Sequence, residues 1–122
     1  MFISGRITIH HRRSGDVVVR LAGDLDAQVL TSARQAIAVA HAVAGRHPVV
    51  LDLSHLTFIG APGLRLLADT RRALHGTGTP LVLLRPSRHL SRVLRLTGLD
   101  QRVRVAHRGR AALRPDASVA AA

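Results

Sequence analysis

The side chains that could carry out chemistry in this chain are histidines, aspartates, serines and threonines. The sequence contains no cysteine. That absence excludes disulfide bonds, thiolate metal sites and thiol catalysis. The eight histidines have no metal-ligand spacing. His10 and His11 are adjacent on a predicted strand and point to opposite faces, and the others are isolated. We therefore predict no metal site and interpret the histidines as surface or boundary residues.

Asp24 and Asp26 stand two residues apart, where a helix is predicted to open. Asp26 is placed to cap the backbone N–H groups of the first turn, and Asp24 is interpreted as holding the turn. The sequence has no phosphate-binding glycine loop and no Gly-x-Ser-x-Gly elbow. Because no nucleophile, base and orienting group can be combined, we predict a protein that is not an enzyme and needs no cofactor.

The most informative segment covers residues 51–64 and has the sequence LDLSHLTFIGAPGL. It predicts a buried strand, a short loop with an apolar end, and a helix that contains a glycine near its start. Gly63 lowers helix propensity, so a bare backbone must serve a purpose there. Two alternatives are open: tight packing of the helix on the sheet, or close approach of a partner to the helix N-terminus.

The elements that position this segment follow from hydrophobic periodicity. Residues 6–10 and 17–21 flank a turn-rich break and predict a β-hairpin. Helices are predicted from the cap Asp26 to Gly45, from Pro62 to Gly76 and from the cap Ser87 to Gly98. Buried strands are predicted at residues 48–53 and 79–84, a loop at 54–59, and a short last strand around 103–105.

This order of elements predicts the α/β class. The expected fold is a mixed sheet, with an N-terminal antiparallel hairpin followed by parallel βαβ units and about three main helices packed on it. The 122 residues fit one domain, which we assign to residues 1–106, and residues 107–122 are predicted to be a disordered C-terminal tail. No apolar run is long enough for a membrane span and no secretory signal is recognisable, so a cytoplasmic protein is expected.

The formal net charge is +11, and every positive side chain is an arginine. These arginines are scattered along the chain, and the only aromatic residues are Phe2 and Phe58, which leaves no stacking platform for single-stranded nucleic acid. A solvated basic surface is therefore favoured over specific nucleic-acid binding. Such a surface would steer the domain towards an acidic protein partner.

The sequence resembles the STAS domain family, which includes the bacterial anti-sigma-factor antagonists. Three segments carry the resemblance. They are Gly23-Asp24-Leu25-Asp26 after the hairpin, Val49-Val50-Leu51-Asp52-Leu53-Ser54 followed by Leu56-Thr57-Phe58-Ile59, and Gly63-Leu64 at the start of a leucine-rich helix. The order and length of the elements also match, from about residue 4 to residue 106.

The resemblance implies a function in protein binding. In that family the helix start usually reads Asp-Ser-Ser-Gly-Leu, and its first serine, or a threonine there, is phosphorylated by an anti-sigma kinase. The unmodified domain binds the anti-sigma factor and so releases the sigma factor. For this chain the implied partner is an anti-sigma factor of the histidine-kinase-like ATPase type. The implied docking surface consists of Asp24, Gly60, Ala61, Pro62, Gly63, Leu64 and Arg65.

The chain departs from the family pattern at the phosphorylation position. Gly60 replaces the aspartate, Ala61 the phosphorylated residue and Pro62 the next serine. Alanine has no oxygen to accept a phosphate, so the usual switch is expected to be absent at Ala61. Ser54 and Thr57 lie nearby and are candidates for a relocated phosphorylation, but we interpret them as ordinary loop and turn residues.

Two other functions are open at this stage. STAS domains also serve as accessory or scaffold subunits of transport and signalling complexes, where the missing hydroxyl would matter little. Nucleic-acid binding through the arginines would give an affinity that falls steeply with salt and has no sequence preference. The sequence also leaves open whether the chain forms a homodimer.

Overall fold

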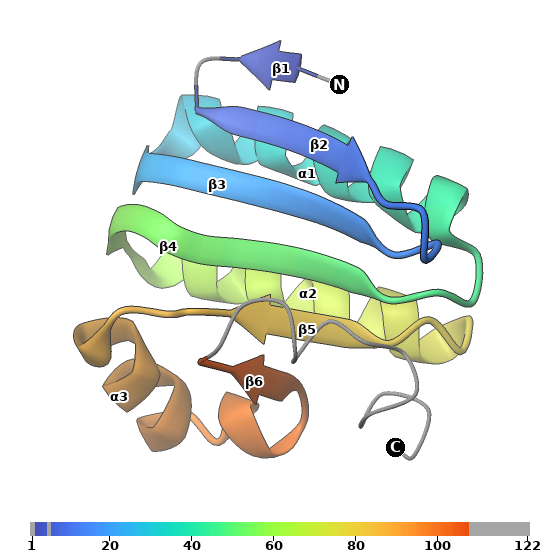
Figure 1. The fold of residues 1–122 in the computed structure, drawn as a ribbon. Helices are drawn as coiled ribbons and strands as arrows, with labels where there is room; N and C mark the ends of the chain where they lie inside the picture. The colour runs from blue at the N-terminus through green and yellow to red at the C-terminus, as the bar shows by residue number, and fades with distance from the viewer. Residues whose placement is uncertain (1, 5, 108–122) are drawn as a thin grey trace.

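The computed structural model describes residues 2–4 and 6–107 (Figure 1). Apart from His107, the tail predicted at 107–122 lies outside the described residues. The elements are β1 (Phe2–Ser4), β2 (Ile7–His11), β3 (Val17–Leu25), α1 (Ala27–Ala44), β4 (Val49–Ile59), α2 (Ala61–Gly76), β5 (Leu81–Leu84), α3 (Arg88–Leu96), the 3₁₀ helix η1 (Leu99–Gln101) and β6 (Arg104–Ala106).

The strands form one mixed sheet in the order β1-β2-β3-β4-β5-β6. The pairs β1–β2 and β2–β3 are antiparallel, and every later pair is parallel. The predicted hairpin and the parallel βαβ units are therefore confirmed. The edge strand β1 is additional, because the prediction began the hairpin at Arg6.

The main core lies between the sheet and the helices α1 and α2, which cover one face of it (Figure 1). Side chains alternate along each strand, so Val17 and Val19 enter this core while Val18 and Arg20 lie on the opposite face. The strand β4 lies between β3 and β5, and its first five residues are all buried. The prediction of a central strand buried on both faces is confirmed.

The predicted helix signals match the caps that the structure contains. The Asp26 carboxylate accepts a hydrogen bond from the Val29 N–H at 3.1 Å, and the Ser87 hydroxyl oxygen accepts one from the Leu90 N–H at 3.0 Å. Gly45 ends α1 with a positive φ of 62°, a backbone conformation that favours glycine. No helix in the described part of the chain is long and apolar enough to span a bilayer.

Two predicted boundaries are wrong, and both errors have the same cause. Residues 54–59 are not a loop, because β4 continues to Ile59, and residues 23–25 do not open a helix, because β3 continues to Leu25. The two strand ends pair with each other as far as Leu25 and Ile59, through two register shifts. Polar residues such as Ser54 and Asp24 interrupt the hydrophobic pattern from which strands are predicted. A strand end at the surface does not need apolar residues at alternate positions, so the pattern stops before the strand does.

Candidate functional site

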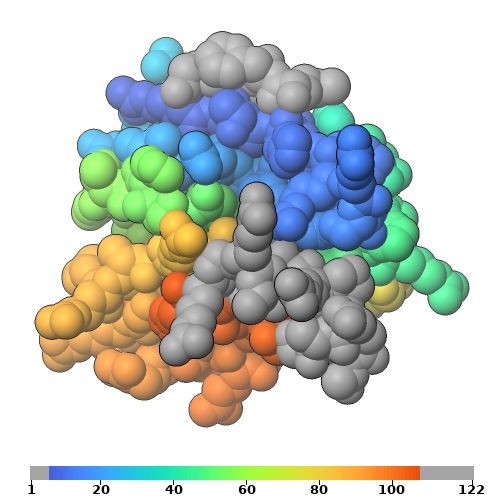
Figure 2. Space-filling view, viewed as in Figure 1, coloured from blue at the N-terminus to red at the C-terminus, as the bar shows by residue number. Residues whose placement is uncertain are grey.

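The carboxyl ends of β3, β4 and β5 point to the same side of the sheet, on the left in Figure 1. Because β4 leads into α2 and β5 leads towards α3, the N-termini of both helices lie at this edge. Figure 2 shows the end of β4 (green) projecting at the rim of the molecule. Of the seven residues of the predicted docking surface, Asp24 lies at the end of β3, Gly60 is the N-cap of α2, and the other five belong to the first turns of α2.

The start of α2 offers a bare, exposed surface. Gly60 is the N-cap residue, with an extended backbone and no side chain to cap the helix. Ala61 and Pro62 form the first turn and are both exposed. This turn therefore presents two apolar side chains at the position where the resemblance expected phosphorylatable hydroxyls.

Gly63 is buried, and its missing side chain lets α2 approach the sheet. A Cβ atom built on Gly63 would lie 2.4 Å from Cγ1 of Ile59 and 3.4 Å from Cδ1 of Leu25. A separation of 2.4 Å is far below van der Waals contact, so an alanine here would push the helix or Ile59 aside. Of the two alternatives for this glycine, the structure contains the tight helix-to-sheet packing.

The remaining residues of the predicted docking surface differ in the solvent exposure of their side chains. Leu64 is half-buried and packs against the main core, whereas the Arg65 side chain is exposed. Asp24 is exposed at the end of β3, where its Oδ1 accepts a hydrogen bond from the Thr57 hydroxyl at 2.6 Å. This bond joins the ends of β3 and β4 beside the start of α2.

Phe58 is a functional candidate that sequence reasoning missed, because it was assigned to the apolar end of a loop. Its ring is 61% exposed, which is unusual for phenylalanine. Ring atom Cε2 lies 3.4 Å from the place where a Gly60 Cβ would be, so the ring sits over the N-cap of α2. Alternation from the buried Leu56 would have placed Phe58 on the same, buried face, so no local signal identifies its exposure. The register of β4 against β3 shifts between Leu56 and Phe58, which breaks the alternation there.

Ser54 is a residue of the strand β4, whereas the sequence predicts a loop residue there. Its hydroxyl donates to Oδ1 of Asp52 at 2.7 Å and lies 3.0 Å from Nδ1 of His55. Asp52 also accepts from the Ser54 N–H at 3.0 Å and from Nε of Arg20, on the neighbouring strand, at 3.3 Å. Burial raises the pKa of Asp52, but the Ser54 hydrogen bonds and the Arg20 charge outweigh it and hold the pKa below its usual range.

The two candidate phosphorylation sites therefore share one feature: each hydroxyl donates to an aspartate. A phosphate on Ser54 would face Asp52, and one on Thr57 would face Asp24. Each placement would oppose two like charges at hydrogen-bond distance. This geometry favours the interpretation of both hydroxyls as structural. The Ser54 hydroxyl binds Asp52 within β4, and the Thr57 hydroxyl joins β4 to Asp24 of β3.

Arginines flank the α2 side of this edge. Arg65 on α2, Arg85 after β5 and Arg88 at the start of α3 are all exposed. Arg85 adopts a positive φ of 53°, a strained conformation for a residue with a side chain, while its N–H donates to the Ala106 carbonyl at 2.7 Å. The edge is thus acidic at Asp24 and Asp26 and basic beside α2.

No three histidine or aspartate side chains gather as a metal site within residues 2–4 and 6–107. The edge exposes an aromatic ring, an apolar first turn and flanking charges. This composition is typical of protein interfaces, where exposed aromatic residues and arginines contribute most to binding.

Comparison with known proteins identifies the family. A family profile described as the STAS domain matches residues 8–112. An anti-sigma factor antagonist from Mycobacterium paratuberculosis is 30% identical, with a TM-score of 0.69 over 93% of this chain and 91% of that one. The Bacillus cell fate determinant SpoIIAA in its phosphorylated form is 24% identical, with a TM-score of 0.69 over 87% and 96% of the two chains. An anti-sigma-factor antagonist (STAS) domain protein from Planctomyces limnophilus is 18% identical, with a TM-score of 0.77 over 90% and 96%. The chain belongs to the STAS domain family.

Proposed function

We propose that this chain is a cytoplasmic anti-sigma-factor antagonist that binds an anti-sigma factor of the histidine-kinase-like ATPase type and is not controlled by phosphorylation at the start of α2. It acts by binding and not by catalysis. The observation that carries the proposal is the exposed first turn of α2, in which Ala61 offers a methyl group at the position where the resemblance implies a phosphorylatable hydroxyl. The 30% identity to an anti-sigma factor antagonist supports the same class of partner.

The docking surface in this proposal is centred on Phe58, Ala61 and Pro62, with Asp24 and Arg65 at its rim. Gly63 and Leu64 shape the surface from within, because Gly63 is buried and Leu64 packs on the core. A partner would cover the exposed ring and the apolar turn and would pair with the charges around them.

The first experiment measures the affinity of the full chain for each histidine-kinase-like anti-sigma factor encoded in its own genome, with and without ATP. Ala61→Glu places a charge in the first turn of α2 and is expected to weaken binding at least tenfold. Phe58→Ala should weaken it to a similar extent by removing the exposed ring. The matched controls are Ala38→Glu on the exposed side of α1 and Leu96→Ala, whose parent side chain is 74% exposed on α3.

A second variant tests the lost switch. Ala61→Ser restores a hydroxyl, and incubation with the bound anti-sigma factor and ATP is expected to add one phosphoryl group to this variant and none to the wild type. Phosphate on wild-type Ser54 or Thr57 would contradict the absence of phospho-control. Binding only to transporter or scaffold subunits would replace the antagonist role with an accessory one.

A further inference from the structure

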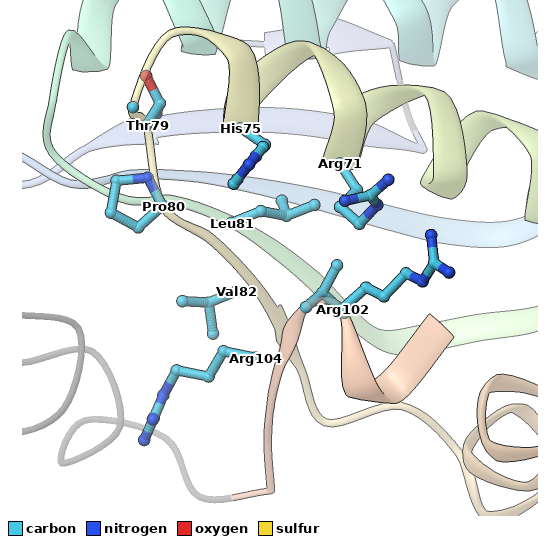
Figure 3. A pocket seen from close by; sticks show the side chains of 10 residues that line it. Arg71, His75, Thr79, Pro80, Leu81, Val82, Arg102 and Arg104 are labelled. Atoms are coloured by element: carbon cyan, nitrogen blue, oxygen red, sulfur yellow. The ribbon is translucent and has the colours of Figure 1, made fainter. Parts of the chain in front are cut away.

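A pocket of about 340 Å³ lies far from the start of α2, at the other end of that helix. It opens between the last turns of α2, the segment that leads into β5, and the segment that joins η1 to β6 (Figure 3). The apolar part of its wall comes from Pro80, Leu81, Val82 and Val103. A volume of this size is at the lower end of the range for small-molecule sites.

The charged side chains that line the pocket, among the described residues, are all arginines. Arg71 comes from α2 together with His75, Arg102 follows η1 and Arg104 begins β6, and no aspartate of the described part of the chain lines the pocket. Figure 3 shows Arg71 and Arg102 on one side of the pocket and Arg104 on the other side, beyond Val82. The pocket therefore has guanidinium groups at both ends of an apolar floor.

These three arginines have no counter-ion within the described residues. The ion pairs in that part of the chain use Arg12, Arg20, Arg34 and Arg72. Asp69 lies two positions before Arg71, but its carboxylate accepts hydrogen bonds from Arg34 and Arg72 instead. Like charges around one pocket repel each other, so a bound anion would lower the free energy of this arrangement.

We propose that this pocket binds a small organic phosphate, with the phosphate group held by Arg71 and Arg102 and the carbon body packed on the apolar floor. Guanidinium groups form paired hydrogen bonds with phosphate oxygens, which makes arginine the usual residue for this task. Pro80, Leu81 and Val103 would contact a ring or short chain attached to the phosphate. The pocket is separate from the start of α2, so the proposal is independent of the docking surface there.

The test titrates the full chain with phenyl phosphate and follows its amide signals by NMR. Saturable shifts are expected around residues 79–82 and 102–104. Inorganic phosphate should bind at least about tenfold more weakly, because it lacks the apolar body, and phenol should not bind. Benzoate distinguishes phosphate from carboxylate as the recognised group: binding as tight as that of phenyl phosphate would overturn the assignment of a phosphate site.

Two variants tie the binding to this pocket. Arg71→Gln and Arg102→Gln are each expected to weaken phenyl phosphate binding at least about fivefold, the loss of one charge-assisted hydrogen bond. Arg95→Gln is the matched control, since it removes one exposed arginine from α3, outside the pocket. Equal weakening in all three variants, or no saturation below about 10 mM, would overturn the proposal. Urea unfolding of each variant checks that the fold is intact.

Discussion

At the scale of single residues, Gly63 shows how a family motif can serve packing. Its neighbours Gly60 and Ala61 are at the surface, but Gly63 itself is buried against Ile59 and Leu25. The glycine sets the distance between α2 and the sheet, and this distance determines where Ala61 and Pro62 stand. A buried residue can therefore shape the proposed docking surface without belonging to it.

Gly63→Ala is expected to lower the free energy of unfolding by about 1–3 kcal/mol, because the added methyl would overlap Ile59. Urea denaturation measures the change. Gly76→Ala is the control: nothing lies within 4 Å of its added Cβ, and alanine is the better helix former. In an Ile59→Ala background the Gly63 change should cost less, and an equal cost in both backgrounds would contradict the proposed clash.

Asp52 gives the fold a pH dependence whose sign follows from its lowered pKa. The folded-state pKa lies below the unfolded value of about 3.9, so the carboxylate stabilises the fold fully above that value. This stabilisation is lost as the pH falls through the folded-state pKa. The unfolded chain binds the proton more readily, which makes acid destabilising.

Asp52→Asn is expected to lower the free energy of unfolding at neutral pH by about 1–3 kcal/mol, since it weakens the buried hydrogen bonds with Ser54 and Arg20. Between about pH 5 and about pH 2 the variant should lose less stability than the wild type. Unfolding curves at several pH values measure both effects. Parallel curves for the two proteins would show that Asp52 does not contribute to the acid sensitivity.

At the scale of elements, the paired ends of β3 and β4 position the proposed docking surface. The Thr57 hydroxyl and the Asp24 carboxylate link the two strands just before α1 and α2 begin. The strands pair through two register shifts there, so this side-chain bond supplements an irregular backbone ladder.

Thr57→Val keeps the shape and the strand propensity of the side chain but removes its hydroxyl. We expect a loss of about 0.5–1 kcal/mol in stability and faster hydrogen exchange at residues 23–25, measured by NMR. Thr31→Val, at an exposed position of α1, is the control and should leave exchange at those residues unchanged. Unchanged exchange in the Thr57 variant would mean that the backbone ladder alone holds the edge.

Elements with a strong local signal were predictable, and those set by tertiary pairing were not. The local sequence is enough to predict the helix caps Asp26 and Ser87 and the strand at residues 49–53, which is a nearly continuous apolar run. The outer half of β4 exists because β3 pairs with it, and no local pattern reports a pairing partner. The exposure of Phe58 was missed for the same reason, so the docking surface predicted from the sequence did not include this aromatic ring.

At the scale of the whole molecule, the net charge of +11 predicts how a partner would be found. If the partner is acidic, its association rate should fall at least about tenfold between about 50 mM and about 500 mM salt, while the dissociation rate changes less. Stopped-flow or surface-based kinetics measure both rates. A salt-independent association rate would show that the arginines do not steer the encounter.

The strand order has a consequence for how the molecule is made. Every strand pairs with the one that precedes it in the chain, so no late segment has to insert between two strands already formed. Each parallel pair is therefore separated in the chain by a single crossover connection, and no pairing has to close a longer loop than that. The sheet can therefore grow at one edge as the chain leaves the ribosome, with each new strand finding its template already exposed.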